Sequence, residues 1–104
     1  VIEELAPYVS EQNVTFKRST NGFHNLDKKI LEGFDRFVIT GCCTDICVMQ
    51  FALSLRTYLN ETGVDKDIIV PRDAVATYDA PNHERDYYEE CALSLMQNAG
   101  ILVV

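Results

Sequence analysis

The spacing of apolar residues changes along the chain, and each change predicts a new element of secondary structure. Residues 37–39 form an unbroken apolar run with β-branched members, which favours a strand over 36–40 that is buried on both faces, as in a parallel sheet. From Thr44 onward the apolar period becomes helical and predicts a helix that ends near residues 60–63. The apolar side of this helix comprises Val48, Phe51, Ala52, Leu55 and Leu59.

The same patterns continue toward the carboxyl end. Residues 67–70 and 101–104 read as further short strands. Between them, the spacing predicts a helix over residues 84–98. Its apolar side is expected to comprise Tyr88, Cys91, Ala92 and Leu95.

The amino-terminal third gives shorter signals. Residues 1–9 form an amphipathic stretch that Pro7 keeps short, and residues 13–16 read as a brief strand. Residues 24–34 carry apolar side chains at helical spacing, with Gly33 where a helix would stop. Alternation of strands and helices predicts an α/β protein: a three-layer Rossmann-like fold with a mainly parallel sheet flanked by helices. Ligands of such sheets collect at the carboxyl ends of the strands, here after Phe16, Thr40 and Val70.

Composition narrows the functional classes. The 104 residues are 47% apolar, which suffices for one core, and the formal net charge is −7 with scattered basic residues. We therefore expect no nucleic-acid partner. No apolar run approaches the ~20 residues of a membrane span, and residues 1–9 lack the features of a signal peptide, so no membrane partner is expected either.

The cysteines are clustered rather than spread for pairing. Cys42 and Cys43 are adjacent, Cys47 follows, and Cys91 stands in the second predicted helix. This arrangement is typical of reduced thiols and predicts a cytoplasmic protein. Metal sites prefer other spacings and nearby histidines, so no zinc site is predicted.

Cys47 occupies a position that favours chemistry. Residues 41–47 form a strand-to-helix turn, and either Thr44 or Asp45 could cap the helix that follows. The amide groups and dipole at a helix start stabilise a thiolate and a developing oxyanion. Position alone leaves two interpretations open: Cys47 is a nucleophile, or the three clustered cysteines are small buried apolar residues.

The surrounding motif favours the first interpretation. The segment "VITGCCTDICV" (38–48) resembles the nucleophile segment of the isochorismatase-like cysteine hydrolases, whose best-known branch is the nicotinamidases. Residues 14–31 and 68–84 resemble two further family segments in the same order, so nearly the whole chain is covered. Three ordered matches are far more specific than one.

The resemblance implies a role for each matched residue. Cys47 would attack an amide carbonyl and form a thioester, and Lys17 would be the catalytic lysine, although a lysine at a strand end is also an ordinary solvated residue. A cis peptide bond between Cys42 and Cys43 would turn the amide of Cys43 to join that of Cys47 in an oxyanion hole. Thr44, Asp45 and Cys42 would hold the loop. 

Three more residues carry weaker expectations. Phe23 matches a family aromatic near the pocket, with a core role equally open. Asp73 is expected to be structural. His83 is either a residue at a helix start or a site residue, and the sequence does not choose between them.

The family's catalytic aspartate and the metal-binding positions of nicotinamidases belong to an upstream segment that these residues do not contain. We therefore expect residues 1–104 to be the carboxyl-terminal portion of a single isochorismatase-like hydrolase domain, which agrees with Val1 as first residue. No cofactor or metal is predicted for this chain, whereas a divalent metal is conceivable in a longer protein. The expected fragment exposes a sheet edge and an apolar face.

The predicted function is cysteine-dependent hydrolysis of a C–N bond in a small-molecule amide, nicotinamide above all, by a homo-oligomer. Three alternatives stay open. One is isochorismatase-type hydrolysis of a vinyl ether, which does not need the cysteine. The second is a catalytically silent binding or assembly module on the same fold, and the third is a redox protein that uses the adjacent cysteines.

Overall fold

The fold is built on short parallel strands that run beneath two long helices. A computed structural model describes residues 1–104. Strands β1 (Arg36–Val38), β3 (Asp67–Val70) and β5 (Leu102–Val103) form a parallel sheet in the order β1-β3-β5. Strands β2 (Gly41–Cys42) and β4 (Val75–Ala76) form a second, two-stranded parallel sheet. The predicted α/β fold, with mainly parallel strands flanked by helices, is confirmed.

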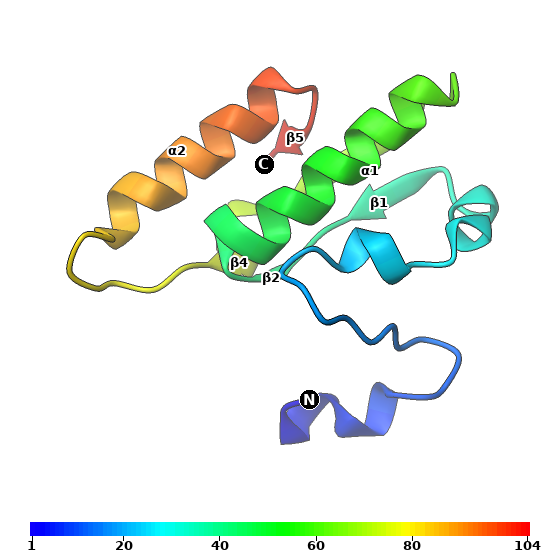
Figure 1. Cartoon of the computed structure of the whole chain (residues 1–104), viewed down its shortest axis with the longest axis horizontal. Helices are drawn as coiled ribbons and strands as arrows, with labels where there is room; N and C mark the ends of the chain where they lie inside the picture. Colours follow the sequence, from blue (N-terminus) through cyan, green and yellow to red (C-terminus); the bar gives the residue numbers. More distant parts are fainter.

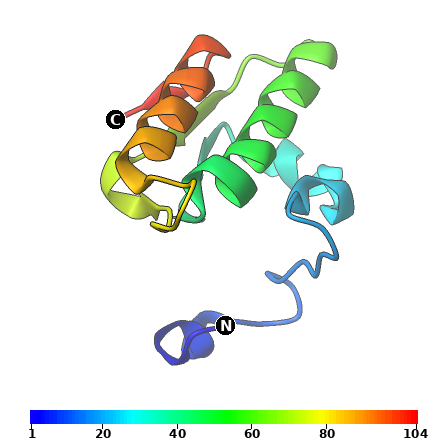
Figure 2. The same cartoon turned by 60° about the vertical axis from the view of Figure 1, so that its left-hand side comes forward.

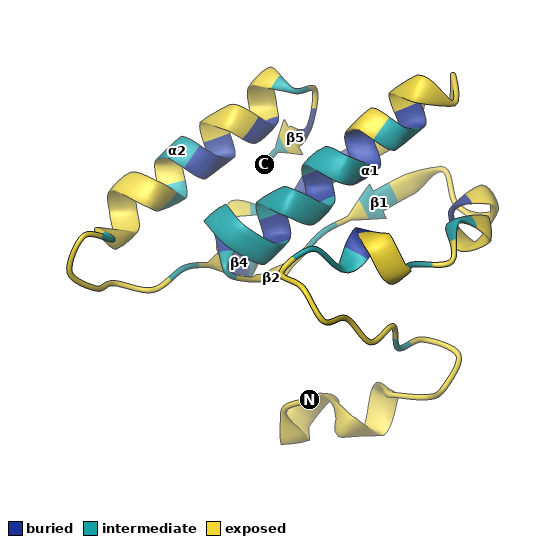
Figure 3. Ribbon diagram, viewed as in Figure 1, coloured by how far each residue is buried: buried dark blue, intermediate teal, exposed yellow.

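The helices are α1 (Met49–Glu61) and α2 (Arg85–Asn98), and they lie side by side over one face of the three-stranded sheet (Figures 1 and 2). The buried residues of both helices face the strands (Figure 3). Ile68 and Val70 of β3 project into this layer and are fully buried. Neither helix is long and apolar enough to cross a lipid bilayer.

Both helices end in the same way, and the sequence explains why. Gly63 and Gly100 follow α1 and α2 with φ angles of 71° and 97°, a conformation that glycine adopts without steric cost. The next amide in each case donates back across the last turn: Val64 to the carbonyl of Leu59, and Ile101 to that of Met96. These Schellman motifs turn the chain directly into the approach to β3 and β5.

The amino-terminal third differs from the prediction. Residues 13–16 form no strand, and residues 24–34 form no α-helix but two short 3₁₀ helices, η2 (Gly22–Asn25) and η3 (Lys28–Gly33). Residues 3–8 form a third, η1 (Glu3–Tyr8), which has Pro7 inside it and no buried residue. Residues 1–16 extend away from the helices and sheets (Figures 1 and 2). Without a neighbouring strand, residues 13–16 have no backbone partners with which to build a ladder.

Strand β1 is also shorter and more exposed than expected. Its three residues replace the predicted strand over 36–40, and Val38 is 58% exposed rather than buried on both faces. The reason is topological, because β1 pairs only with β3 and both long helices cover the opposite face. Beside it lies an open hollow of about 330 Å³, nine of whose ten lining residues are hydrophobic. The expected exposed edge and apolar surface are therefore present.

The buried side of α2 is rotated from the predicted one. Ala92 is buried as expected, but Leu95 is exposed, and Leu93 and Met96 take the core positions. Spacings of three and four residues fit both stripes, so periodicity alone could not separate them. The contact of α2 with α1 and β5 decides which stripe is buried.

Replacing Leu93 by alanine tests this assignment. We expect the free energy of unfolding to fall by about 2–5 kcal/mol, because the side chain is 1% exposed and its loss leaves a cavity. Leu95→Ala is the matched control, and its effect should stay within about 0.5 kcal/mol. Urea denaturation followed by circular dichroism measures both. Equal losses would contradict the assignment.

Candidate functional site

The site begins where β2 passes into α1. The Cys42–Cys43 peptide bond is cis, as the resemblance implied. A π-helical turn, η4 (Thr44–Val48), follows and continues directly into α1. The amide of Val48 donates to the carbonyl of Cys43 at 3.1 Å, which gives this turn a wider ring than an α-helix has.

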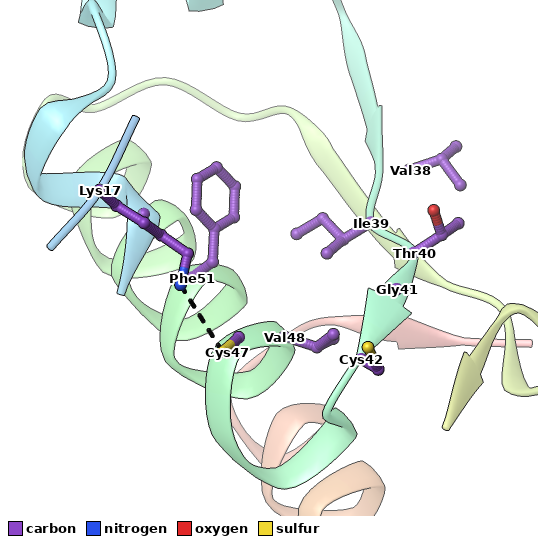
Figure 4. A pocket seen from close by; sticks show the side chains of 10 residues that line it. Lys17, Val38, Ile39, Thr40, Gly41, Cys42, Cys47, Val48 and Phe51 are labelled. Atoms are coloured by element: carbon purple, nitrogen blue, oxygen red, sulfur yellow. Dashed lines mark hydrogen bonds between the residues drawn. The ribbon is translucent and has the colours of Figure 1, made fainter. Parts of the chain in front are cut away.

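An open cavity of about 380 Å³ lies over this turn, and Cys47 and Lys17 both line it (Figure 4). The ammonium Nζ of Lys17 points at the sulfur of Cys47 and lies 3.7 Å from it. The contact brings a positive charge directly to the candidate nucleophile. The other lining residues are Gly22, Val38, Ile39, Thr40, Gly41, Cys42, Val48 and Phe51.

Lys17 reaches the thiol from a segment without regular secondary structure, not from the strand end that the sequence predicted. Hydrogen bonds to α1 hold this segment: Thr20 Oγ1 donates to Gln50 Oε1 and Asn21 Nδ2 to Ser54 Oγ, each at 2.9 Å. Gly22 leaves room for the lysine, because a Cβ at this position would lie 3.3 Å from Cδ of Lys17. Side-chain hydrogen bonds, and not pairing with a neighbouring strand, therefore hold the segment that carries the ammonium of Lys17.

The other two cysteines of the cluster directly precede the turn. Cys42 is exposed and lines the cavity, and Cys43 is partly buried. The amide of Cys43 has no acceptor in the chain, whereas its carbonyl accepts from both Ile46 and Val48. A free amide beside the candidate nucleophile is what an oxyanion hole requires.

Thr44 and Asp45 do not cap the helix, which corrects the prediction. Cys43 is the N-cap residue and makes no side-chain cap bond. The buried hydroxyl of Thr44 donates to Glu89 of α2 at 2.9 Å. Asp45 turns away from solvent: its Oδ1 accepts from Thr77 Oγ1 at 2.6 Å, and its Oδ2 lies 2.7 Å from Nε2 of His83. Both residues therefore bind η4, the turn that carries Cys47 and is called the nucleophile turn below, to distant parts of the chain.

The Asp45–His83 pair is largely shielded, with side chains 11% and 13% exposed. Burial opposes ionisation of Asp45, but the hydrogen bonds from Thr77 and His83 outweigh it and lower the pKa of Asp45 below 3.8. The hydrogen bond to Asp45 raises the pKa of His83 above 6.5 against the opposing effect of burial. Below pH 6.5 the two groups therefore form an ion pair.

The family follows from comparison with known sequences. The sequence model of the isochorismatase domain matches residues 1–96. The chain belongs to the isochorismatase family. Comparison with curated protein sequences gives no significant match.

Solved structures of isochorismatase-family proteins share this fold. A nicotinamidase from Staphylococcus aureus is 26% identical with a TM-score of 0.64, over 84% of this chain and 49% of that one. A pyrazinamidase/nicotinamidase from Streptococcus mutans is 27% identical with a TM-score of 0.65, over 85% and 44%. An isochorismatase-like hydrolase from Alkaliphilus metalliredigens is 24% identical with a TM-score of 0.69, over 99% and 51%. The chain thus spans about half the length of these relatives.

Two of the remaining candidate residues lie outside the cavity of this isochorismatase-family chain. Phe23 is 9% exposed and packs edge-to-face on Phe51 and Tyr58, with ring centroids 5.9 and 5.5 Å away. It belongs to the core, and Phe51 forms the cavity wall in its place. Asp73 is exposed and its side chain makes no hydrogen bond.

His83 is the residue whose role the sequence left open, and the structure places it against Asp45. A signal was present in "DAPNH" (79–83), because a proline and an asparagine before the histidine are typical of a tight turn that fixes its position. The sequence did not show that this turn lies against Asp45. No group of three or more His, Cys, Asp or Glu side chains is arranged to hold a metal ion.

Removing the ammonium should make Cys47 less reactive. In Lys17→Met, we expect alkylation of Cys47 by iodoacetamide at pH 7 to slow by roughly fivefold, the effect of one unit charge at about 4 Å through water. Peptide mass spectrometry resolves Cys47 from the other cysteines. Lys29→Met is the control, because Nζ of Lys29 has no partner in the chain. An unchanged rate in Lys17→Met would show that the contact does not activate the thiol.

Thr77→Val should weaken the attachment of Asp45. Losing the hydroxyl donor raises the pKa of Asp45, so the stability that its ionised form contributes is lost at a higher pH as the solution is acidified. At neutral pH we expect a loss of about 1 kcal/mol. Acid and urea unfolding measure the two effects. Thr57→Val, whose hydroxyl bonds only its own helix, should leave the acid transition in place.

Proposed function

We propose that the protein to which this chain belongs is a cysteine-dependent hydrolase of C–N bonds in small amides, with nicotinamide as the first candidate substrate. The observation that carries the proposal is the 3.7 Å contact between Lys17 Nζ and Cys47 Sγ inside an open cavity. The likeness to two structures described as nicotinamidases supports the choice of substrate. A cavity of about 380 Å³ suits a ligand with a single ring.

The chemistry proceeds through two displacements. The thiolate of Cys47 attacks the amide carbonyl carbon, a C–S bond forms, and the oxyanion accepts hydrogen bonds from the amides of Cys43 and Cys47. The C–N bond then breaks and the nitrogen leaves as ammonia after gaining a proton. Water attacks the thioester, releases the carboxylic acid and restores the thiol. Amide and water are consumed, and acid and ammonia are formed.

Lys17 and the proton-transfer group have separate tasks in this scheme. The fixed charge of Lys17 stabilises the thiolate before attack. A general base must take the thiol proton and deliver it to the departing nitrogen. Asp45 does not suit this task, because His83 and Thr77 occupy its carboxylate and it does not line the cavity. The resemblance assigns the task to an aspartate upstream of these residues.

The cysteines also support a reducing location. All four are free thiols, including the adjacent pair Cys42 and Cys43. Free thiols close together persist where cellular reductants keep them reduced. We therefore propose a cytoplasmic location for the protein.

The test is release of ammonia from nicotinamide by the full-length protein. We expect Cys47→Ala to lower kcat by at least about a thousandfold, as loss of a nucleophile does. Cys91→Ala, on α2 outside the cavity, is the control and should keep full activity.

Other outcomes separate the alternatives. Nicotinamide hydrolysis that survives in Cys47→Ala would contradict the thioester mechanism. Hydrolysis of isochorismate without Cys47 would indicate the vinyl ether reaction. A folded protein that releases ammonia from no small amide, and whose Cys47 resists alkylation until unfolding, would be a silent binding module.

A further inference from the structure

We propose that His83 is a positioning residue for Cys47: as an imidazolium it clamps the loop of residues 77–83 to the nucleophile turn through Asp45, and its deprotonation loosens that turn. The inference rests on the proposed function only for its catalytic consequence. The clamp itself is a property of the fold. The clamp makes the reactivity of Cys47 depend on the protonation of His83.

The hydrogen-bond partners of the ring require the cation. Nε2 lies 2.7 Å from the carboxylate Oδ2 of Asp45, and Nδ1 lies 2.9 Å from the carbonyl oxygen of Tyr78. A carbonyl and an ionised carboxylate can only accept hydrogen bonds, so each ring nitrogen must carry a proton. A neutral imidazole has one N–H and would turn a lone pair toward one of these oxygens.

Aromatic packing and a tight turn fix the ring in this place. It lies between the rings of Tyr78 and Tyr88, with centroids 4.1 and 4.4 Å away and interplanar angles of 16° and 14°. Ala80 and His83 exchange two backbone hydrogen bonds around the Pro81-Asn82 turn. Asn82 has a φ of 64°, which matches the third position of a type II turn. These contacts hold the ring where each of its nitrogens faces an acceptor.

Asp45 transmits the clamp to the nucleophile. It stands two residues before Cys47 in η4, and both of its oxygens are occupied, one by Thr77 and one by His83. Both hydrogen bonds between the loop and the turn run through this one carboxylate. When the ring loses its proton, one shielded hydrogen bond is replaced by the contact of two acceptors.

The direction of the pH effect follows from the groups that face the ring. They are the carboxyl group of Asp45 from η4, the ring and carbonyl of Tyr78 from the loop, and the ring of Tyr88 from α2. Glu89 of α2 reaches η4 separately, through Thr44. Because Asp45 raises the pKa of His83, the clamp is complete below pH 6.5 and is lost as the pH rises through the higher folded value.

The first experiment reads the ring directly. Nitrogen-15 NMR of the full-length protein should show both ring nitrogens of His83 protonated at pH 6.5, with a titration above that pH. A His24→Gln variant assigns the signals, because His24 is the other histidine of the chain. A His83 ring that is a single neutral tautomer at pH 6 would overturn the proposal.

The second experiment measures the effect on Cys47. His83→Phe keeps an aromatic ring between the tyrosines but removes both N–H groups, and His83→Gln keeps an uncharged donor toward Asp45. At pH 6.5 we expect alkylation of Cys47 to slow roughly 2- to 12-fold in His83→Phe, the range for one lost hydrogen bond, with partial recovery in His83→Gln. As the pH rises past the titration of His83, the wild type should lose its advantage over both variants.

His24→Gln is the matched control and should react like the wild type at every pH. A folded His83→Phe protein that matches the wild type throughout would overturn the proposal. If that variant does not fold, His83→Gln and the NMR titration decide, since a wild-type pH profile in His83→Gln also contradicts it.

These readouts need no substrate, so the two proposals can fail separately. A protonated ring and a pH-dependent alkylation advantage, without ammonia release from any amide, would refute the hydrolase and leave the clamp. Amide hydrolysis with an unchanged kcat and pH profile in His83→Phe would refute the clamp and leave the hydrolase.

Discussion

Parallel pairing of short strands is the constraint on which the site depends. Because β2 and β4 run in the same direction, with Gly41 opposite Val75 and Cys42 opposite Ala76, the segments that follow them leave the sheet at the same edge. One segment is the turn that carries Cys47, and the other leads to His83. Residues more than thirty positions apart therefore meet at distances set by two pairs of strand residues.

Two basic side chains then act on this turn from different sides. Lys17 approaches the sulfur across the open cavity, where its charge bears on the reacting atom itself. His83 approaches the shielded side and binds Asp45, where its charge bears on the position of the backbone. Solvent screens the first contact more than the second. In the two proposals, the charge of Lys17 adjusts the chemistry of the thiol, and that of His83 holds the thiol in place.

The core that supports the site is concentrated in one layer. Leu55, Ile68, Leu93 and Met96 are nearly or completely buried between the helices and the sheet. On the surface beside β1, the apolar side chains of Val38 and Phe34 are more than half exposed. Thr20 and Asn21 donate hydrogen bonds to α1, and Phe23 packs on the aromatic rings of Phe51 and Tyr58. The loop that bears Lys17 depends on these contacts.

The sequence by itself determined the elements whose signals are local. The periods of residues 44–61 and 84–98, and the glycines that follow them, report helix and helix end without reference to the rest of the chain, and the Thr-Asp-x-Cys motif marked Cys47. Tertiary structure decided what each element meets. The unpaired state of residues 13–16, the rotation of α2 and the partners of Asp45 all depend on which segments lie side by side. A spacing pattern records which residues share a face, but the hydrogen bonds that join Asp45 to Thr77 and His83 span 32 and 38 residues and exist only once the strands have paired.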